Sequence, residues 1–198
     1  MVKPIRVRDA VREPLPRLLV NRFHTTSSAL KRLMYRGELN DWANFCQDVR
    51  NTTDSQNWTN ETIKYSLNSR NLEENEVFVG DETGVQGRFQ QAIGQALGMT
   101  FRAQTLDIRF ADFKCIGDTI ITTPDCVMKT LNNQIKVVGE FKVPWVDEHS
   151  IALSRDTVQP FNPGFRLRIL LAQPLKYMKD LQCMYGFLST YEETIFLR

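Results

Sequence analysis

Long apolar runs are missing from this chain of 198 residues. No stretch approaches the roughly 20 consecutive apolar residues that a membrane-spanning helix needs. Residues 1–8 also lead into no apolar signal region. We therefore expect an intracellular protein, in the nucleus or the cytoplasm, that has no membrane partner.

Cysteine and histidine ligands for a metal are also scarce. The four cysteines are far apart in the sequence and show no paired C-x-x-C spacing, which argues against a structural zinc site and a disulfide framework. The two histidines are too few for a histidine-rich metal site. We expect His149, which follows Asp147 and Glu148, to be a solvated loop residue.

Neither sign of charge dominates, since 25 lysines and arginines face 23 acids, but the two signs are unevenly placed. Residues 1–40 contain nine basic and three acidic side chains, whereas residues 41–82 contain three basic and nine acidic ones. The basic arm at the start fits two interpretations: it neutralises phosphates of a nucleic acid, or it is a solvated helical face that pairs with the acidic stretch. Its members are Arg6, Arg8, Arg12, Arg17, Arg22, Lys31, Arg32 and Arg36.

Residues 1–78 are expected to form a helical N-terminal region. After a proline-rich start, Ser27 or Ser28 can cap a helix that Gly37 ends. The expected helices cover residues 27–37, 39–46 and 62–67, and a polar turn covers residues 51–60.

Residues 79–198 show a sharper pattern of alternating helices and strands. An apolar stripe predicts a helix over residues 82–97 that Gly98 closes. A second helix over residues 165–184 contains Pro174, which is expected to kink or divide it. Strands are expected at residues 106–110, 119–128, 134–142, 185–190 and 194–197, with a loop at residues 147–162.

Two carboxylates and one amine lie at the spacing of a metal-dependent phosphodiesterase site. Asp125 follows a proline, and Glu140, Phe141 and Lys142 close the next strand. Alternation of side chains along a strand puts Glu140 and Lys142 on one face. A hairpin through the polar turn at residues 131–133 would bring Asp125 beside that face.

These residue types suit phosphodiester hydrolysis, which needs a cation to offset charge on the phosphoryl oxygens and a water more acidic than bulk. Mg²⁺ takes oxygen ligands and keeps several waters. Asp125, Glu140 and the carbonyl of Phe141 would therefore hold it, and Lys142 would orient or deprotonate the water. The alternative is an exposed strand edge, but the neighbouring valines favour a position inside the sheet, where burying these charges without a metal is costly.

A second triplet of the same form, Asp112-Phe113-Lys114, is a warning against reading the pattern alone. No Pro-Asp pair precedes it, and it falls before the predicted hairpin. We therefore expect only the later triplet to have an acid on the preceding strand.

The two predicted helices add polar residues to this group. Glu82 opens the first helix and Gln86 lies one turn further on the same face, so both could look into the site. The alternative for Glu82 is an N-terminal acid favoured by the helix dipole. Gln173 and Tyr177 project from one face of the second helix, where a tyrosine at the core edge with a glutamine nearby is the alternative.

In this order, the residues resemble the PD-(D/E)XK nuclease superfamily, and the Q-x-x-x-Y spacing is similar to that of its recombination-exonuclease branch. The residues concerned are Glu82, Pro124-Asp125, Glu140-Phe141-Lys142, Gln173 and Tyr177. Residues 83–90, 139–145 and 185–194 also resemble a group of fungal proteins placed in that superfamily. The resemblance covers roughly residues 80–198 and implies an α/β, restriction-endonuclease-like αβββαβ core with a central mixed sheet flanked by helices.

The resemblance further implies a metal-dependent nuclease, and we expect DNA to be its substrate in preference to RNA. Mg²⁺ or Mn²⁺ would be held by Asp125 and Glu140 with help from Glu82, and Lys142 would aid catalysis. Gln173 and Tyr177 would border the site, although Pro174 departs from the uninterrupted helix of the superfamily. Two alternatives are a catalytically inactive nuclease-fold module that binds or regulates within a larger protein, and a secreted or translocated effector of the same fold.

Overall fold

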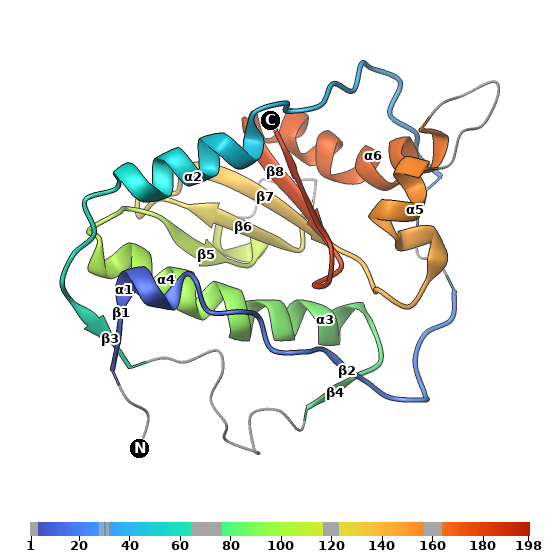
Figure 1. Cartoon of the computed structure of the whole chain (residues 1–198). Coiled ribbons are helices and arrows are strands. Elements are labelled where there is room, and N and C mark those ends of the chain that lie inside the picture. The colour runs from blue at the N-terminus through green and yellow to red at the C-terminus, as the bar shows by residue number, and fades with distance from the viewer. Residues whose placement is uncertain (1–3, 28–29, 31, 65–76, 117–122, 157–163) are drawn as a thin grey trace.

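A five-stranded mixed sheet forms the centre of the computed structural model, which describes residues 4–27, 30, 32–64, 77–116, 123–156 and 164–198 (Figure 1). The strand order is β5-β6-β7-β8-β9, and every pair is antiparallel except β7 with β8. The expected mixed central sheet is confirmed. The strands span Arg109–Ala111 (β5), Cys126–Lys129 (β6), Ile135–Phe141 (β7), Tyr185–Ser189 (β8) and Thr194–Leu197 (β9).

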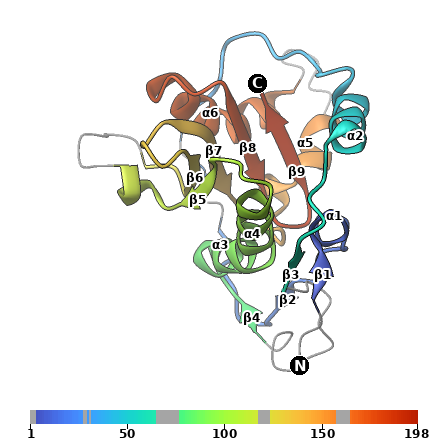
Figure 2. The same cartoon turned by 90° about the vertical axis from the view of Figure 1, so that its left-hand side faces the viewer.

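Helices cover both faces of this sheet (Figures 1 and 2). On one face, Val85 and Phe89 pack with Phe141 and Phe187, and on the other a second apolar core joins helix α6 to the strands. The first face carries α3 (Glu82–Phe89), the π-helical turn η2 (Gln90–Gly94) and α4 (Gln95–Ala103), and the second carries α6 (Phe165–Asp180). The second core includes Leu170, Leu171, Met178, Val127, Val138 and Leu188.

The predicted hairpin between β6 and β7 is confirmed. Cys126 lies opposite Gly139, and Asn133 in the turn has a left-handed backbone with φ 65°. Gly139 is required by close approach, because a Cβ there would lie 2.3 Å from the ring of Phe187 and 2.6 Å from Sγ of Cys126. The start of the strand predicted at residues 119–128 lies partly outside the described residues, and β6 takes its end.

The helix that begins at Glu82 is longer than predicted. Asp81 caps it by accepting a hydrogen bond from Gly84 N at 2.8 Å. The helix continues through Gly98 and ends at Ala103, because Thr105, not Gly98, has the left-handed backbone with φ 57°. The extension packs Met99 and Ala103 against the small apolar cluster formed by Val7, Ala10 and Ile63.

Helix α6 runs without interruption through Pro174, so the predicted division is wrong. Proline removes one backbone donor from the helix. Residues on both sides of it, among them Leu171 and Met178, are buried against the sheet, and this packing holds the helix together. The predicted loop before it contains the short helices η4 (Asp147–His149) and α5 (Ile151–Asp156).

The N-terminal region contains less helix than predicted. The described residues between 21 and 44 form none. Instead, Arg168 on α6 donates to the carbonyls of Tyr35 and Gly37, and Tyr35 N donates to the carbonyl of Arg168 at 3.0 Å. These tertiary contacts override the local preference for helix. Ser28 lies outside the described residues.

Two further predictions for the N-terminal region are wrong: one predicted helix is shifted along the sequence, and another is replaced by a strand. Helix α2 spans Phe45–Ser55 in place of the one predicted at residues 39–46, and it includes part of the predicted turn. The described start of the helix predicted at residues 62–67 is instead a strand that pairs with Ile5 and Arg6. The remaining elements are β1 (Ile5–Arg6), α1 (Val7–Ala10), β2 (Leu19–Val20), β3 (Thr62–Ile63) and β4 (Phe78–Val79).

Within the described ranges, none of the helices has the length and apolar character needed to cross a membrane.

Candidate metal centre

Asp125 is held in place at the start of β6 by contacts from two other elements. Its backbone N donates to the carbonyl of Gly139 at 3.1 Å, and its Oδ2 accepts a hydrogen bond from Phe141 N at 2.7 Å. Nε2 of Gln86 on α3 donates to the carbonyl of Asp125 at 2.5 Å. The carboxylate is therefore fixed across the hairpin and tied to the first helix.

Glu140 and Lys142 are buried side chains on one face of β7 and its continuation, with exposed fractions of 1% and 2%. They alternate with Phe141, whose ring packs on Phe89 with a centroid distance of 4.6 Å on the α3 face. The main chain of Lys142 is fixed as well, because its N donates to the carbonyl of Ser189 at 3.0 Å.

The ammonium of Lys142 uses its three donors within this group. Nζ donates to Oε1 of Glu140 at 2.6 Å, to Oε2 of Glu82 at 3.0 Å and to the carbonyl of Phe141 at 2.7 Å. Glu82 reaches the group from the first residue of α3 and stays partly exposed. The side chain of Lys142 thus links β7 to the first residue of α3.

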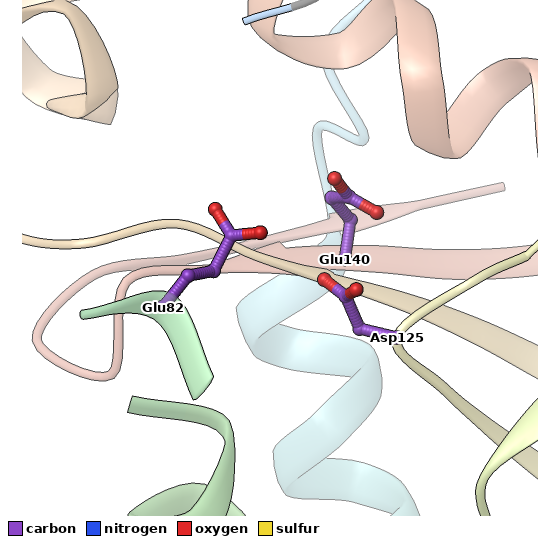
Figure 3. A group of neighbouring side chains, drawn as sticks. All are labelled: Glu82, Asp125 and Glu140. Carbon is purple, nitrogen blue, oxygen red and sulfur yellow. The ribbon is translucent and has the colours of Figure 1, made fainter. Parts of the chain in front are cut away.

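Three carboxylates converge beside this lysine. One oxygen each of Glu82, Asp125 and Glu140 lies within 4.8 Å of the others. Figure 3 shows the side chains pointing into the same space from α3, from the start of β6 and from β7. The structure therefore brings together the four charged residues that the sequence suggested.

The local electrostatics are those of crowded, partly compensated acids. Burial raises the pKa of Glu140 to about 8, with Asp125 and Glu82 adding to the effect and Lys142 opposing it. Burial also raises the pKa of Asp125, against the Phe141 amide and Lys142. For Lys142, burial lowers the pKa, but the carboxylates of Glu140 and Glu82 outweigh it and the net shift is upward.

The donor set suits a hard divalent cation. All side-chain ligands offered are carboxylate oxygens, which Mg²⁺ and Mn²⁺ prefer. None of the residues that the structure describes donates a hydrogen bond to the buried Oε2 of Glu140. A buried carboxylate oxygen without a donor is costly unless a proton or a cation compensates it, so the residues present fit such an ion.

Gln173 and Tyr177 contact each other on the same face of α6. Nε2 of Gln173 donates to the hydroxyl of Tyr177 at 2.5 Å. Tyr177 is buried, and its pKa is raised by this burial and by the negative charge of Glu140. The tyrosine therefore lies within electrostatic reach of the acidic group.

Of the residues expected to bind nucleic acid, some lie away from the centre and others contact protein groups instead. Gln86 binds the backbone beside Asp125. Arg6 and Arg8 are exposed on β1 and α1, which lie beside α4 and away from the start of α3 (Figures 1 and 2). Arg12, which follows α1, forms an exposed ion pair with Asp54 of the acidic stretch at 3.2 Å. Arg32 is exposed, and Lys31 lies outside the described residues.

His149 corrects an expectation, because it is 1% exposed and not a solvated loop residue. Its Nδ1 lies 3.1 Å from the carbonyl of Val143, the residue after Lys142. Burial lowers its pKa, and the contact with Val143 only partly offsets this. The apolar stretch around Val143 and Val146, both buried, was the sequence signal that this segment belongs to the core.

Comparison with known proteins adds no relative: no protein-family model, no curated protein and no solved structure matches the chain. The interpretation of the centre therefore depends on its own geometry.

Proposed function

We propose that this chain is a nuclease that hydrolyses phosphodiester bonds with Mg²⁺ or Mn²⁺, on DNA rather than RNA, and that residues 79–198 form a restriction-endonuclease-like PD-(D/E)XK core. One observation carries the proposal. Three carboxylate oxygens, from Glu82, Asp125 and Glu140, lie within 4.8 Å of one another, and an ammonium group is hydrogen-bonded to two of the three residues.

Each residue of the centre has a chemical task in this proposal. Glu82, Asp125 and Glu140 would hold the ion, with the carbonyl of Phe141 adjacent. When bound, the ion supplies positive charge at the phosphoryl oxygens and a more acidic water. Lys142 places a second positive charge in the same space, where it would orient the water and stabilise charge that develops on the phosphate.

The surroundings favour a site built for function over one built for stability. Two of the three carboxyl groups beside Lys142, those of Glu140 and Asp125, have raised pKa values because they are desolvated, and burying such ionisable groups lowers the stability of the fold. Such clusters of perturbed acids are typical of catalytic sites. Tyr177 and Gln173, which contact each other on α6, would form one border of this space.

The test combines cleavage with a readout that needs no activity. Plasmid, single-stranded DNA and RNA are incubated with the protein in Mg²⁺, in Mn²⁺ or in chelator, beside Asp125→Asn and the matched variant Asp112→Asn. We expect cleavage in either metal, none in chelator, and loss in Asp125→Asn alone. In parallel, the metal should raise the melting temperature of the wild type. At a metal concentration a hundredfold above Kd, binding adds about 2.7 kcal/mol to the free energy of unfolding.

The outcomes separate the candidate functions. Thermal stabilisation by metal without cleavage of any substrate indicates the catalytically inactive module. Cleavage that survives Asp125→Asn, or a melting temperature that metal leaves unchanged, contradicts the proposed centre.

A further inference from the structure

The inner part of the N-terminal segment is hydrogen-bonded to residues that flank the candidate metal centre in sequence. Thr25 N donates to the carbonyl of Gly80 at 2.8 Å, two residues before Glu82. Nε1 of Trp145, three residues after Lys142, donates to the carbonyl of Thr25 at 2.7 Å. The segment is therefore hydrogen-bonded both to the residues just before Glu82 and to those just after Lys142.

One arginine and three aromatic rings form two contacting pairs here, and Trp145 is the one member that lies outside the N-terminal segment. The guanidinium carbon of Arg22 lies 4.6 Å from the ring centroid of Phe23, and the ring of His24 lies 5.3 Å from that of Trp145. We call Arg22, Phe23, His24 and Trp145 the aromatic platform. Trp145 packs on the apolar core of the α3 face, which anchors the platform to the sheet.

Phe23 has no role in the core that would explain its position. Its exposed fraction is 73%, although a phenylalanine ring loses stabilisation when it is left in water. Arg22 covers part of the ring, and the rest faces solvent. An exposed ring beside a cation is the arrangement that stacks on a nucleobase and neutralises the neighbouring phosphate.

Within the described residues, no carboxylate forms an ion pair with Arg22. Arg22 itself is exposed. The platform therefore presents positive charge and aromatic surface together, which complements a phosphate backbone with accessible bases.

We propose that the aromatic platform binds a nucleic-acid strand with unpaired bases and leads it toward the metal centre. Bases in a duplex stack on each other and reach a protein ring only after costly unstacking, whereas unpaired bases stack on an aromatic side chain at no such cost. The platform thus favours single strands, frayed ends or loops over continuous duplex. Its link to catalysis rests on the proposed nuclease function, but the binding itself does not.

Binding is measured in chelator, so that cleavage plays no part. Fluorescence anisotropy compares labelled oligo(dT), oligo(U) and a duplex, each about 20 nucleotides long to cover several stacking contacts. We expect the wild type to bind the single strands more tightly than the duplex. Phe23→Ala should weaken single-strand binding roughly five- to hundredfold, and Phe23→Tyr should restore it, because stacking on one base has that effect on the dissociation constant.

Matched controls separate stacking from general surface effects. Leu131 is also 73% exposed, but it lies in the turn between β6 and β7, and Leu131→Ala should leave binding within about twofold. Arg22→Ala should lower the salt dependence by about one phosphate contact. Arg50→Ala on α2, which Figures 1 and 2 place away from β2 and β4, should not.

The two proposals fail in different ways. A protein that cleaves nothing but loses single-strand affinity with Phe23→Ala has the platform without the nuclease activity. A protein that cleaves normally and binds oligo(dT) and oligo(U) equally well with Phe23→Ala has no such platform. Preferential duplex binding that Phe23→Ala leaves unchanged would also overturn the platform.

Discussion

Two segments of this chain have the same order of acid, phenylalanine and lysine, but the structure uses them differently. Glu140 and Phe141 end the middle strand of the sheet, Lys142 follows them directly, and all three are buried. Asp112 and Lys114 are exposed beside the short helix η3 (Phe113–Ile116), and Lys114 lies over the ring of its own neighbour Phe113 at 5.1 Å.

The difference shows that position, not composition, makes the candidate centre. The triplet at residues 140–142 meets Asp125 across the hairpin and Glu82 from α3. The triplet at residues 112–114 follows an edge strand, where water solvates both charges. Substitutions at matching positions of the two triplets should therefore differ in their effects on stability and activity.

The phenylalanines should give the largest contrast in stability. Phe141 is fully buried between Phe89 and Phe187, so Phe141→Ala should lower the free energy of unfolding by about 3–5 kcal/mol. Phe113 is only half-buried, and Phe113→Ala should cost roughly 1 kcal/mol or less. Urea denaturation measures both. Equal losses would show that the two rings have similar surroundings.

The two lysines should give the second-largest contrast in stability. Lys142→Met removes the only cation that the structure places among three carboxylates in the described part of the chain. In chelator, this should cost about 3 kcal/mol of unfolding free energy, because breaking a buried ion pair leaves its partner charge uncompensated. Lys114→Met should change stability by no more than about 0.5 kcal/mol. A Lys142→Met variant as stable as the wild type would mean that the acids carry no charge when folded.

The acids should differ in activity. If the proposed function holds, Glu140→Gln should lower cleavage in Mg²⁺ at least about a hundredfold, since it removes a ligand charge at the reacting phosphate, equivalent to about 2.7 kcal/mol of transition-state stabilisation. Asp112→Asn should stay within about twofold. Circular dichroism checks that both variants are folded. Equal activity of the two variants would remove Glu140 from the centre.

The residue before each triplet should show the smallest difference. Gly139→Ala places a methyl group against Phe187 and Cys126 and should cost about 1–3 kcal/mol of unfolding free energy. Ala111→Gly on β5, before the triplet at residues 112–114, should cost about 0.5–1 kcal/mol through backbone entropy, with a small further loss of methyl packing on the second apolar core. Thermal denaturation of both variants compares the positions, and a neutral Gly139→Ala would show that the strands separate there easily.

The sequence predicted those features that depend on local pattern. Alternation along residues 134–142 and the turn before it were sufficient for the hairpin, and the hairpin brings Asp125 to Phe141 N. The mixed sheet with helices on both faces was expected as well. These features follow from side-chain period and turn residues, which neighbouring positions determine.

Features set by distant contacts were missed. The predicted helix over residues 27–37 is absent from its described part, because Arg168 holds the carbonyls of Tyr35 and Gly37. Pro174 does not divide α6, because packing on the sheet supports both halves. His149 is buried because the core includes the segment after Lys142. These contacts join residues that are far apart in the sequence, so the pattern of neighbouring residues does not predict them.

The parallel pairing of β7 with β8 affects when the centre can assemble. Glu140 lies opposite Leu188, and the chain between them must cross over through α6 before the two strands meet. Pairs so distant in sequence form slowly during folding. The carboxylate of Glu140 therefore acquires its final surroundings only after β8 has paired with β7, so the candidate centre assembles late in folding.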